Sequence, residues 1–423
     1  MTDPVAGLSL IPFRALRPAV DSDRLGRLLC PPYDVIDDTL RASLLSGDRD
    51  NAVALILPRA SAGADPYEAA AVRLGNAVAD GLYTVDDAPA LYVYEMTDHA
   101  GSTRGLLGAV VLRDPADGVI APHENTMAGP VADRLALMTA TEANLEPIYL
   151  VYDGGGAASR AVREIDSQPT VAEARTPDGV RHRLWAITDA ATHAAIAEDL
   201  AERRALIADG HHRYATYREL QARYDHERGP GPWDRGLTLL VDSSDYGPQV
   251  HAIHRVLVGQ PLSVTLDRLN GWAEVSEAAD PQDGLRQVEQ IEGFAAVVAD
   301  AERAFVIIDA ERRLRDAATQ PGDVSALADL DVSVLHRALV TQVWGLPDTI
   351  EQVAYAHSVA EATAHATASG GTAVLLRATP VAAVAAVAAA GGRMPRKSTL
   401  FTPKPASGLV MRRFVDEHPG GEP

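Results

Sequence analysis

ALIADGHHRY (residues 205–214) is an apolar run that leads through Asp209, Gly210 and two histidines into a helical segment, Tyr214 to Arg223. The pattern predicts a strand, a tight turn and the N-terminus of a helix. The free backbone N–H groups and the positive dipole end of such a helix favour an anion, and Gly210 lets a phosphate approach the main chain. The alternative is that Asp209 only caps the helix. We expect a turn that binds phosphate.

The side chains of this turn add the groups that phosphate chemistry needs. Asp209 suits a divalent metal ion or a hydroxyl group. His211, His212 and Arg213 are donors for phosphate oxygens, and Arg213 can bind them as a fork. If the turn is only a cap, the two histidines are surface residues.

Length and composition restrict the class of protein. A chain of 423 residues is expected to form two or three domains. It contains no apolar run of roughly 20 residues, and its first 20 residues have no signal-peptide core. We therefore expect a cytoplasmic protein. Its only cysteine, Cys30, excludes an intrachain disulfide and a cysteine-rich zinc site.

The charge of the chain argues against nucleic acid or a membrane surface as a general partner, because the formal net charge is −20. Only two of the 38 basic residues are lysines, Lys397 and Lys404, and they lie close together. With Ser398 and Thr399 between them, they predict a phosphate-binding segment. Chance placement in a solvated loop is the alternative.

Two further polar clusters are candidates for substrate binding or catalysis. PHENT (residues 122–126) contains Glu124, a candidate general base for an acceptor hydroxyl. The neighbours His123, Asn125 and Thr126 would bind substrate, although the cluster would also serve to cap a helix near Val131. Asp34 follows two prolines that would hold its carboxylate rigidly at a site, but this segment is equally typical of a turn.

Short strands alternate with helices along the chain, which predicts an α+β protein with a mixed sheet. One expected strand is Ala52 to Leu57. We expect three regions and a tail: an N-terminal α/β region (1–113), a catalytic core (114–250), a C-terminal α/β region that supplies the lysine segment (251–416), and residues 417–423. No Walker A loop, dinucleotide fingerprint, nucleophile elbow or zincin motif is present. Phosphoryl transfer fits the remaining polar residues best.

These motifs resemble those of a widespread bacterial family of formerly unknown function, marked by PPYDVI, PHENT, ADGHHRY and a late lysine segment (P-x-K-S-T-x-F-x-P-K). The matches run from Pro31 to Lys404. The His-Glu element and the DGHHR turn also resemble kinases of the ParB/sulfiredoxin fold that phosphorylate free L-serine. This resemblance implies a ParB/sulfiredoxin-like core. It also implies that Glu124 is the base, and that residues 209–213, His211 among them, hold the donor phosphates and Mg²⁺. The extra Pro-Pro-Tyr-Asp segment keeps Asp34 open as the alternative base.

The resemblance implies a magnesium-dependent kinase that converts free L-serine to O-phospho-L-serine. The extra lysines and the lack of a recognisable adenine pocket favour diphosphate as the donor, with ATP or ADP as alternatives. Two other functions stay open: a ParB-like nucleotide-binding regulatory module, and a phosphotransferase or phosphatase acting on another small metabolite. The sequence does not decide the oligomeric state.

Overall fold

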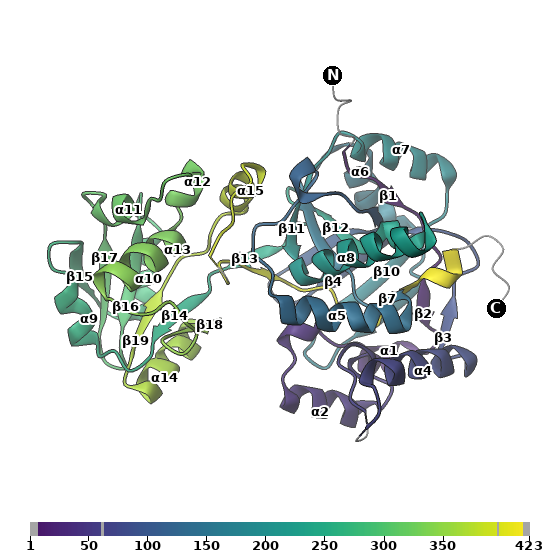
Figure 1. Ribbon diagram of the computed structural model, residues 1–423, viewed down its shortest axis with the longest axis horizontal. Coiled ribbons are helices and arrows are strands. Elements are labelled where there is room, and N and C mark those ends of the chain that lie inside the picture. The colour runs from purple at the N-terminus through teal and green to yellow at the C-terminus, as the bar shows by residue number, and fades with distance from the viewer. Residues whose placement is uncertain (1–6, 61–62, 396, 418–423) are drawn as a thin grey trace. The chain divides into compact units, whose positions relative to one another are not determined.

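The computed structural model describes residues 7–60, 63–395 and 397–417 (Figure 1). The chain divides into two compact units. The first unit comprises residues 1–122, 126–248 and 403–423, and the second comprises residues 123–125 and 249–402. Each unit is described by itself below.

A mixed nine-stranded sheet forms the centre of the first unit, with the strand order β6-β11-β8-β12-β5-β4-β10-β9 and β1 paired to β5. The pairs β6·β11 and β8·β12 are parallel, and the other pairs are antiparallel. The strands are β1 (Leu10–Ile11), β4 (Leu91–Thr97), β5 (Ser102–Val111), β6 (Ile120–Ala121), β8 (Ile148–Tyr152), β9 (Ala172–Arg175), β10 (Arg181–Ile187), β11 (Ala205–Asp209) and β12 (Arg235–Asp242).

Four short strands form two smaller ladders in this unit, β2·β3 and β7·β21. They are β2 (Leu16–Pro18), β3 (Tyr83–Val85), β7 (Ala143–Asn144) and β21 (Arg412–Arg413). The α-helices are α1 (Ser22–Leu28), α2 (Asp38–Gly47), α3 (Val53–Ile56), α4 (Pro66–Ala79), α5 (Ala128–Thr141), α6 (Gly156–Glu164), α7 (Ala190–Leu200) and α8 (His211–Arg228). Short 3-10 turns are η1 (Tyr33–Val35), η2 (Pro115–Asp117), η3 (Ile165–Ser167), η4 (Pro232–Asp234) and η6 (Phe414–Glu417).

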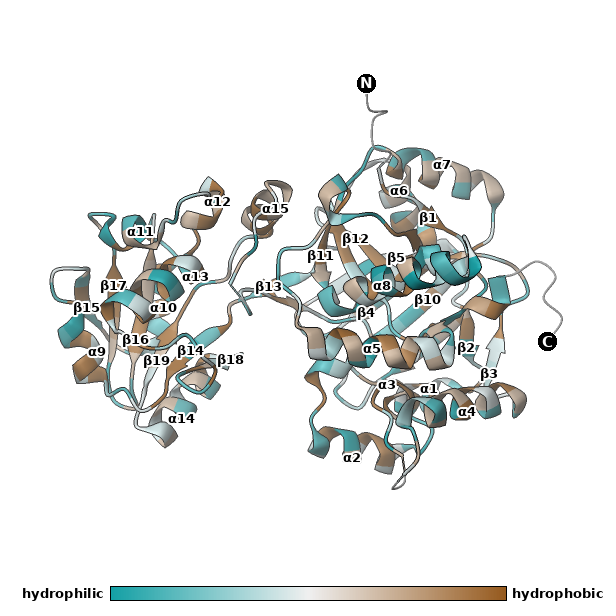
Figure 2. Ribbon diagram, viewed as in Figure 1, coloured by the Kyte–Doolittle hydropathy of each residue, from teal (hydrophilic) through white to brown (hydrophobic). Residues whose placement is uncertain are grey.

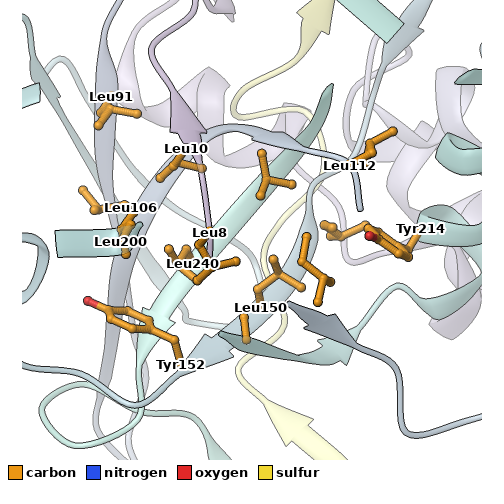
Figure 3. Packing of buried hydrophobic residues seen from close by; sticks show 14 of the residues in the cluster. Leu8, Leu10, Leu91, Leu106, Leu112, Leu150, Tyr152, Leu200, Tyr214 and Leu240 are labelled. Atoms are coloured by element: carbon orange, nitrogen blue, oxygen red, sulfur yellow. The ribbon is translucent and has the colours of Figure 1, made fainter. Parts of the chain in front are cut away.

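The core of the first unit is built from both sides of residue 113. Leu10, Leu106, Leu150 and Leu240 come from different strands and pack into one buried cluster (Figure 3). Because β4 and β5 pair within the same sheet as β12, residues 1–113 share a core with the region that follows. The N-terminal α/β region therefore lies in the same compact unit as most of the expected catalytic core.

The C-terminal segment returns to the first unit. Arg412 is fully buried and donates hydrogen bonds to Asn144, to two backbone carbonyls and to Glu417. Ser407 pairs with the backbone of Cys30, the single cysteine, which is buried and unbonded to another sulfur. Residues 403–417 therefore do not belong with the C-terminal region as expected. Of the expected tail, residues 418–423 lie outside the described part of the chain.

The second unit contains an antiparallel sheet with the order β15-β17-β16-β19-β14-β18. Its strands are β14 (His254–Leu257), β15 (Glu274–Ala278), β16 (Ala295–Ala299), β17 (Ala304–Ile308), β18 (Val353–Ala356) and β19 (Thr372–Leu375), and a separate ladder joins β13 (Gln249–His251) to β20 (Leu400–Thr402). The helices are α9 (Leu262–Arg268), α10 (Pro281–Val288), α11 (Arg313–Ala318), α12 (Ser325–Ala328), α13 (Asp331–Val334), the π-helix η5 (Leu335–Val343), α14 (Val359–Ser369) and α15 (Val381–Ala389).

Hydrophobic residues follow the strands of this sheet (Figure 2). Because its sequence, AAVVA, is apolar throughout, every residue of β16 can be buried, as observed. Together the two units make a mixed α+β protein with a mixed sheet, as predicted. Across the described ranges, no helix is both long and apolar enough to cross a membrane.

The expected strand at Ala52 to Leu57 is wrong, because these residues form the short helix α3. All four residues of α3 are buried, so the run is apolar on every side and its periodicity cannot separate strand from helix. The helix start is fixed by Asn51, whose amide side chain accepts from the Val53 N–H and donates to the carbonyls of Arg27 and Leu29. Such local side-chain bonding to the backbone favours a turn.

We expect Leu150→Ala to lower the free energy of unfolding by about 2–5 kcal/mol, because it opens a cavity in the cluster of Figure 3. Denaturant unfolding followed by circular dichroism measures the change. The control is Val171→Ala at a residue 40% exposed, where we expect a change within about 0.5 kcal/mol. Equal effects of the two substitutions would contradict the assignment of this core.

Candidate functional site

The predicted strand, turn and helix are present at β11 and α8. β11 ends at Asp209, Gly210 adopts the left-handed conformation with φ 91°, and α8 begins at His211. A Cβ atom on Gly210 would lie 3.1 Å from a methyl carbon of Ile148 and 3.2 Å from Nε of Arg213. Both the backbone conformation and the close neighbours therefore require glycine.

The carboxylate of Asp209 bridges two cations. Its Oδ2 lies 2.5 Å from Nη2 of Arg213, and its Oδ1 lies 2.5 Å from Nζ of Lys404. The same ammonium group lies 3.0 Å from Oδ2 of Asp34. We call this row of four alternating charges, Asp34–Lys404–Asp209–Arg213, the ion chain. It joins three segments that are far apart in the sequence.

Arg213 is a buried member of the ion chain, with 1% of its surface exposed. Burial opposes its charge, but the carboxylates of Glu146, Asp209 and Asp34 outweigh that effect and raise the pKa of Arg213. Its Nη1 donates to the carbonyl of Pro147, and its Nη2 to Asp209. Two arms of the guanidinium are thus committed within the protein, an arrangement that orients Asp209 and differs from an open fork for phosphate.

Lys404 remains protonated in this environment. Burial alone would lower its pKa, but the neighbouring Asp209 and Asp34 raise the pKa above its usual value. Its side chain is 15% exposed, compared with 31% for Asp34 and 11% for Asp209. The lysine is therefore a fixed positive charge that solvent still reaches.

A second set of polar groups supports Asp34. The backbone N–H of its neighbour Tyr33 donates to Glu146 over 3.1 Å, and the hydroxyl of Ser407 donates to the same carboxylate oxygen over 3.0 Å. Arg134 lies 3.7 Å from the other oxygen of Glu146 and stacks 4.3 Å from the Tyr33 ring centre. Burial raises the pKa of Tyr33 to about 12. No local sequence motif marks Glu146 or Arg134, so neither residue was a predicted site residue.

The two histidines of the turn differ in exposure, because His211 is buried and His212 is half-buried. His211 is 8% exposed, and Nε2 of His212 accepts a hydrogen bond of 3.1 Å from the Met127 N–H. Because that nitrogen is an acceptor, the proton of neutral His212 lies on Nδ1. Thr126, beside Met127, is exposed in the same unit.

The second unit brings the other two predicted motifs together. Nε2 of His123 lies 3.1 Å from the hydroxyl of Thr399, and the His123 carbonyl accepts from the Met394 N–H. His123 is 1% exposed, Glu124 is half-buried and Asn125 is exposed. His123 and Thr399 are therefore neighbours in space, although they lie 276 positions apart in the sequence.

Arg255 holds the lysine segment in position. This fully buried residue donates to the Lys397 carbonyl over 3.0 Å and to Nε2 of His336 over 2.9 Å, while Nδ1 of His336 lies 2.9 Å from Asp348. Burial lowers the pKa of Arg255 to about 10, partly offset by Tyr355, Asp348 and Glu124. Lys397 itself has φ 55°, and the Ser398 hydroxyl donates to the Pro395 carbonyl. No sequence motif indicated His336 or Asp348.

The predicted site residues thus form two groups, one in each unit. The first unit holds Asp34, Thr126, Asp209, Gly210, His211, His212, Arg213 and Lys404, and the second holds His123, Glu124, Asn125, Lys397, Ser398 and Thr399. In the first group, ion pairs connect Asp34, Lys404, Asp209 and Arg213. In the second group, His123 contacts Thr399. A joint role for Glu124 and Asp209 stays a prediction.

The ion chain does not form a magnesium cage of its own. Within the described ranges, no group of three or more His, Cys, Asp or Glu side chains is arranged to hold a metal ion. Both oxygens of Asp209 contact cations, and the ammonium of Lys404 lies between Asp209 and Asp34. Direct binding of Mg²⁺ would require carboxylate oxygens that these cations occupy.

One family model matches most of the chain. The family described as "Protein of unknown function (DUF1015)" matches residues 10–333. No curated protein gives a significant match.

Three solved structures are similar at low identity. A free serine kinase in complex with AMP is 16% identical with a TM-score of 0.34, covering 67% of this chain and 83% of that one. A conserved hypothetical protein from Pyrococcus furiosus is 16% identical with a TM-score of 0.34, covering 70% and 93%. SbnI with a C-terminal truncation, from Staphylococcus aureus, is 10% identical with a TM-score of 0.37, covering 74% and 90%.

We expect Lys404→Met to lower the free energy of unfolding by about 2–3 kcal/mol at pH 7, because it leaves two partly buried carboxylates without their shared cation. Urea unfolding measures the loss.

The double variant Lys404→Met/Asp34→Asn provides the control. Removing one of the two carboxylates should restore part of the stability lost in the single variant. A loss that is unchanged in the double variant would show that Lys404 contributes by packing alone.

Proposed function

The chain belongs to the family described as "Protein of unknown function (DUF1015)", a description that assigns no reaction. We propose that it is a phosphotransferase that phosphorylates free L-serine. Diphosphate is the favoured donor in this proposal, with ATP and ADP as alternatives. The product is O-phospho-L-serine.

The observation that carries the proposal is the ion chain at the N-terminus of α8. Phosphoryl transfer depends on fixed cations, backbone donors and positioned carboxylates more than on covalent chemistry by the protein. The turn offers all three, because Lys404 is a cation that solvent reaches, α8 presents its first N–H groups, and Asp209 is held between Lys404 and Arg213. Because Asp34 and Asp209 flank Lys404, a phosphate group would bind here through Lys404 together with the N–H groups of α8.

The acceptor and the base come from the motif resemblance. In this proposal Glu124 removes the proton from the serine hydroxyl, whose oxygen attacks the terminal phosphorus of the donor. The bridging P–O bond of diphosphate then breaks, and orthophosphate leaves. The neighbouring His123 is held by Thr399 and Met394, which supports a fixed position for the segment that carries Glu124. Asp34 is the alternative base, since it lies beside Lys404 in the ion chain.

Lys397 and Lys404 are proposed to bind the donor and the leaving phosphate, together with Ser398 and Thr399. Magnesium enters the proposal only as an ion carried by the donor phosphates. This form agrees with the usual binding of Mg²⁺ through substrate phosphates and few protein groups.

Phosphorus NMR tests the reaction directly. The purified protein is incubated with magnesium and L-serine, in parallel with diphosphate, ATP or ADP, and the phosphoserine signal is followed. A signal with one donor supports the proposal and identifies the donor. Hydrolysis of a donor without phosphoserine would instead support a phosphatase, and binding of a nucleotide without turnover would support a ParB-like regulatory module.

We expect Glu124→Gln to lower kcat by about 10²–10⁴-fold with little change in donor binding, because a positioned base is lost. Asp34→Asn is the decisive comparison, measured with the same assay and with calorimetric donor titration. If Asp34→Asn abolishes turnover while Glu124→Gln retains it, the base is Asp34. Glu274→Gln, at an exposed strand residue, is the control and should retain full activity.

We expect Lys397→Ala to raise the apparent KM for the donor by about tenfold while leaving the KM for serine unchanged, because one charge-assisted contact to phosphate is lost. Lys397→Arg keeps the charge and should retain much of the donor affinity. An effect of Lys397→Ala confined to serine would overturn this role of the lysine.

A further inference from the structure

An arginine-lined cavity lies in the first unit, outside the ion chain. It has a volume of about 820 Å³ and is lined by residues between Ala19 and Leu82, from α1, α2, α4 and the segments that connect them. Five guanidinium groups line it, those of Arg24, Arg41, Arg49, Arg59 and Arg73. Among the described residues that line it, Asp50 and Asp80 are acidic. The lining is therefore cationic, in a protein whose formal net charge is −20.

The arginines of this cavity outnumber their carboxylate partners. Asp50 alone faces three of them, with distances of 3.1 Å to Arg24, 3.7 Å to Arg73 and 3.8 Å to Arg49. Arg24 also pairs with Asp48 over 3.0 Å, and Arg59 pairs with Asp38. Three carboxylates therefore pair with four of the five guanidinium groups. The side chain of Arg49 is 92% exposed and that of Arg73 is 47% exposed, so both remain available to a ligand.

Arg41 is the cavity arginine whose charge is least neutralised by nearby carboxylates. Its Nε donates to the Leu57 carbonyl over 3.1 Å, and within the described ranges no carboxylate comes within 4.0 Å of its guanidinium group. Burial, and then the neighbouring cation of Arg59, lower the pKa of Arg41. An anion placed here would relieve the repulsion among the arginines, and their planar forks match phosphate oxygens.

The cavity also has an apolar wall. Leu45, Pro58 and Leu82 line it, together with Val72, which is 62% exposed although it is a large hydrophobic residue. Cationic groups beside an apolar wall suit a ligand that combines a charged end with an organic body. A volume of about 820 Å³ lies within the range of small-molecule sites.

We propose that this cavity binds a small organic phosphate carrying at least two negative charges, as an effector site separate from the reaction proposed above. Its lining includes none of Asp34, Asp209, Arg213 and Lys404. The inference therefore stands whether or not the protein phosphorylates serine.

The backbone at the end of α3 connects this cavity with the groups around Asp34. The carbonyl of Ile56 accepts from Arg134 over 2.6 Å, and the next carbonyl, of Leu57, accepts from Arg41 over 3.1 Å. Arg134 in turn stacks on Tyr33, the neighbour of Asp34. A ligand that draws Arg41 toward its phosphate would pull on the same short helix that holds Arg134.

Isothermal titration of the full chain with tripolyphosphate, ADP or inorganic phosphate tests the proposal. We expect ADP or tripolyphosphate to bind with a Kd at least tenfold below that of inorganic phosphate, since several guanidinium groups act together. Preferred binding of ADP would identify a nucleotide-like ligand that uses the apolar wall. Equal binding of tripolyphosphate would identify the phosphate groups alone as the recognised feature.

The variant Arg41→Gln/Arg73→Gln should weaken that binding by at least about tenfold. The matched control Arg286→Gln/Arg303→Gln removes two exposed arginines of the second unit and should leave binding unchanged. Arg49→Gln, at the most exposed of the cavity arginines, is a second variant that should weaken binding without affecting the fold.

No binding, or binding that survives both cavity variants, would overturn the proposal. Binding lost in Lys404→Met but retained in the cavity variants would assign the ligand to the ion chain instead.

Discussion

The ion chain Asp34–Lys404–Asp209–Arg213 is the constraint on which the candidate site depends. Each of its charges is taken partly or fully out of water, and such charges are stable only when they are paired. The pairing fixes the turn before α8, the Pro-Pro-Tyr-Asp segment and the C-terminal segment against one another. Removing one member would therefore leave the charges of its partners unpaired in a low-dielectric environment. The same geometry leaves the ammonium group of Lys404 within reach of solvent.

The predicted polar motifs are distributed over the two units. Residues 123–125 belong to the second unit although the residues on both sides belong to the first, so the PHENT motif lies where the chain crosses between units. There His123 bonds to Thr399, and Arg255 holds the backbone of Lys397 while resting on the His336–Asp348 pair. Burial disfavours the charge of Arg255 and lowers its pKa to about 10, so keeping it here costs stability. The hydrogen bond from Arg255 to the Lys397 carbonyl fixes the backbone of that segment in return.

Electrostatics also distinguishes the two groups of cations described above, the ion chain and the arginine-lined cavity. With a net charge of −20, a phosphate ligand is repelled by most of the surface and needs cations that carboxylates do not fully neutralise. At the ion chain, two carboxylates and two cations alternate, which suits positioning. In the arginine-lined cavity, Arg24, Arg49 and Arg73 share Asp50 and Arg41 has a backbone carbonyl instead, which suits binding.

The sequence by itself determined the strand, turn and helix around Gly210, the mixed α+β class and the main candidate residues, because these depend on local periodicity and on turn chemistry. It did not determine α3, whose four buried residues carry no distinguishing period. Nor did it reveal Glu146, Arg134, His336 or Asp348, which matter only through partners far along the chain. The return of residues 403–417 to the first unit was decided by tertiary structure alone, since the buried hydrogen bonds of Arg412 and the pairing of Lys404 with Asp34 and Asp209 arise only when those distant segments meet.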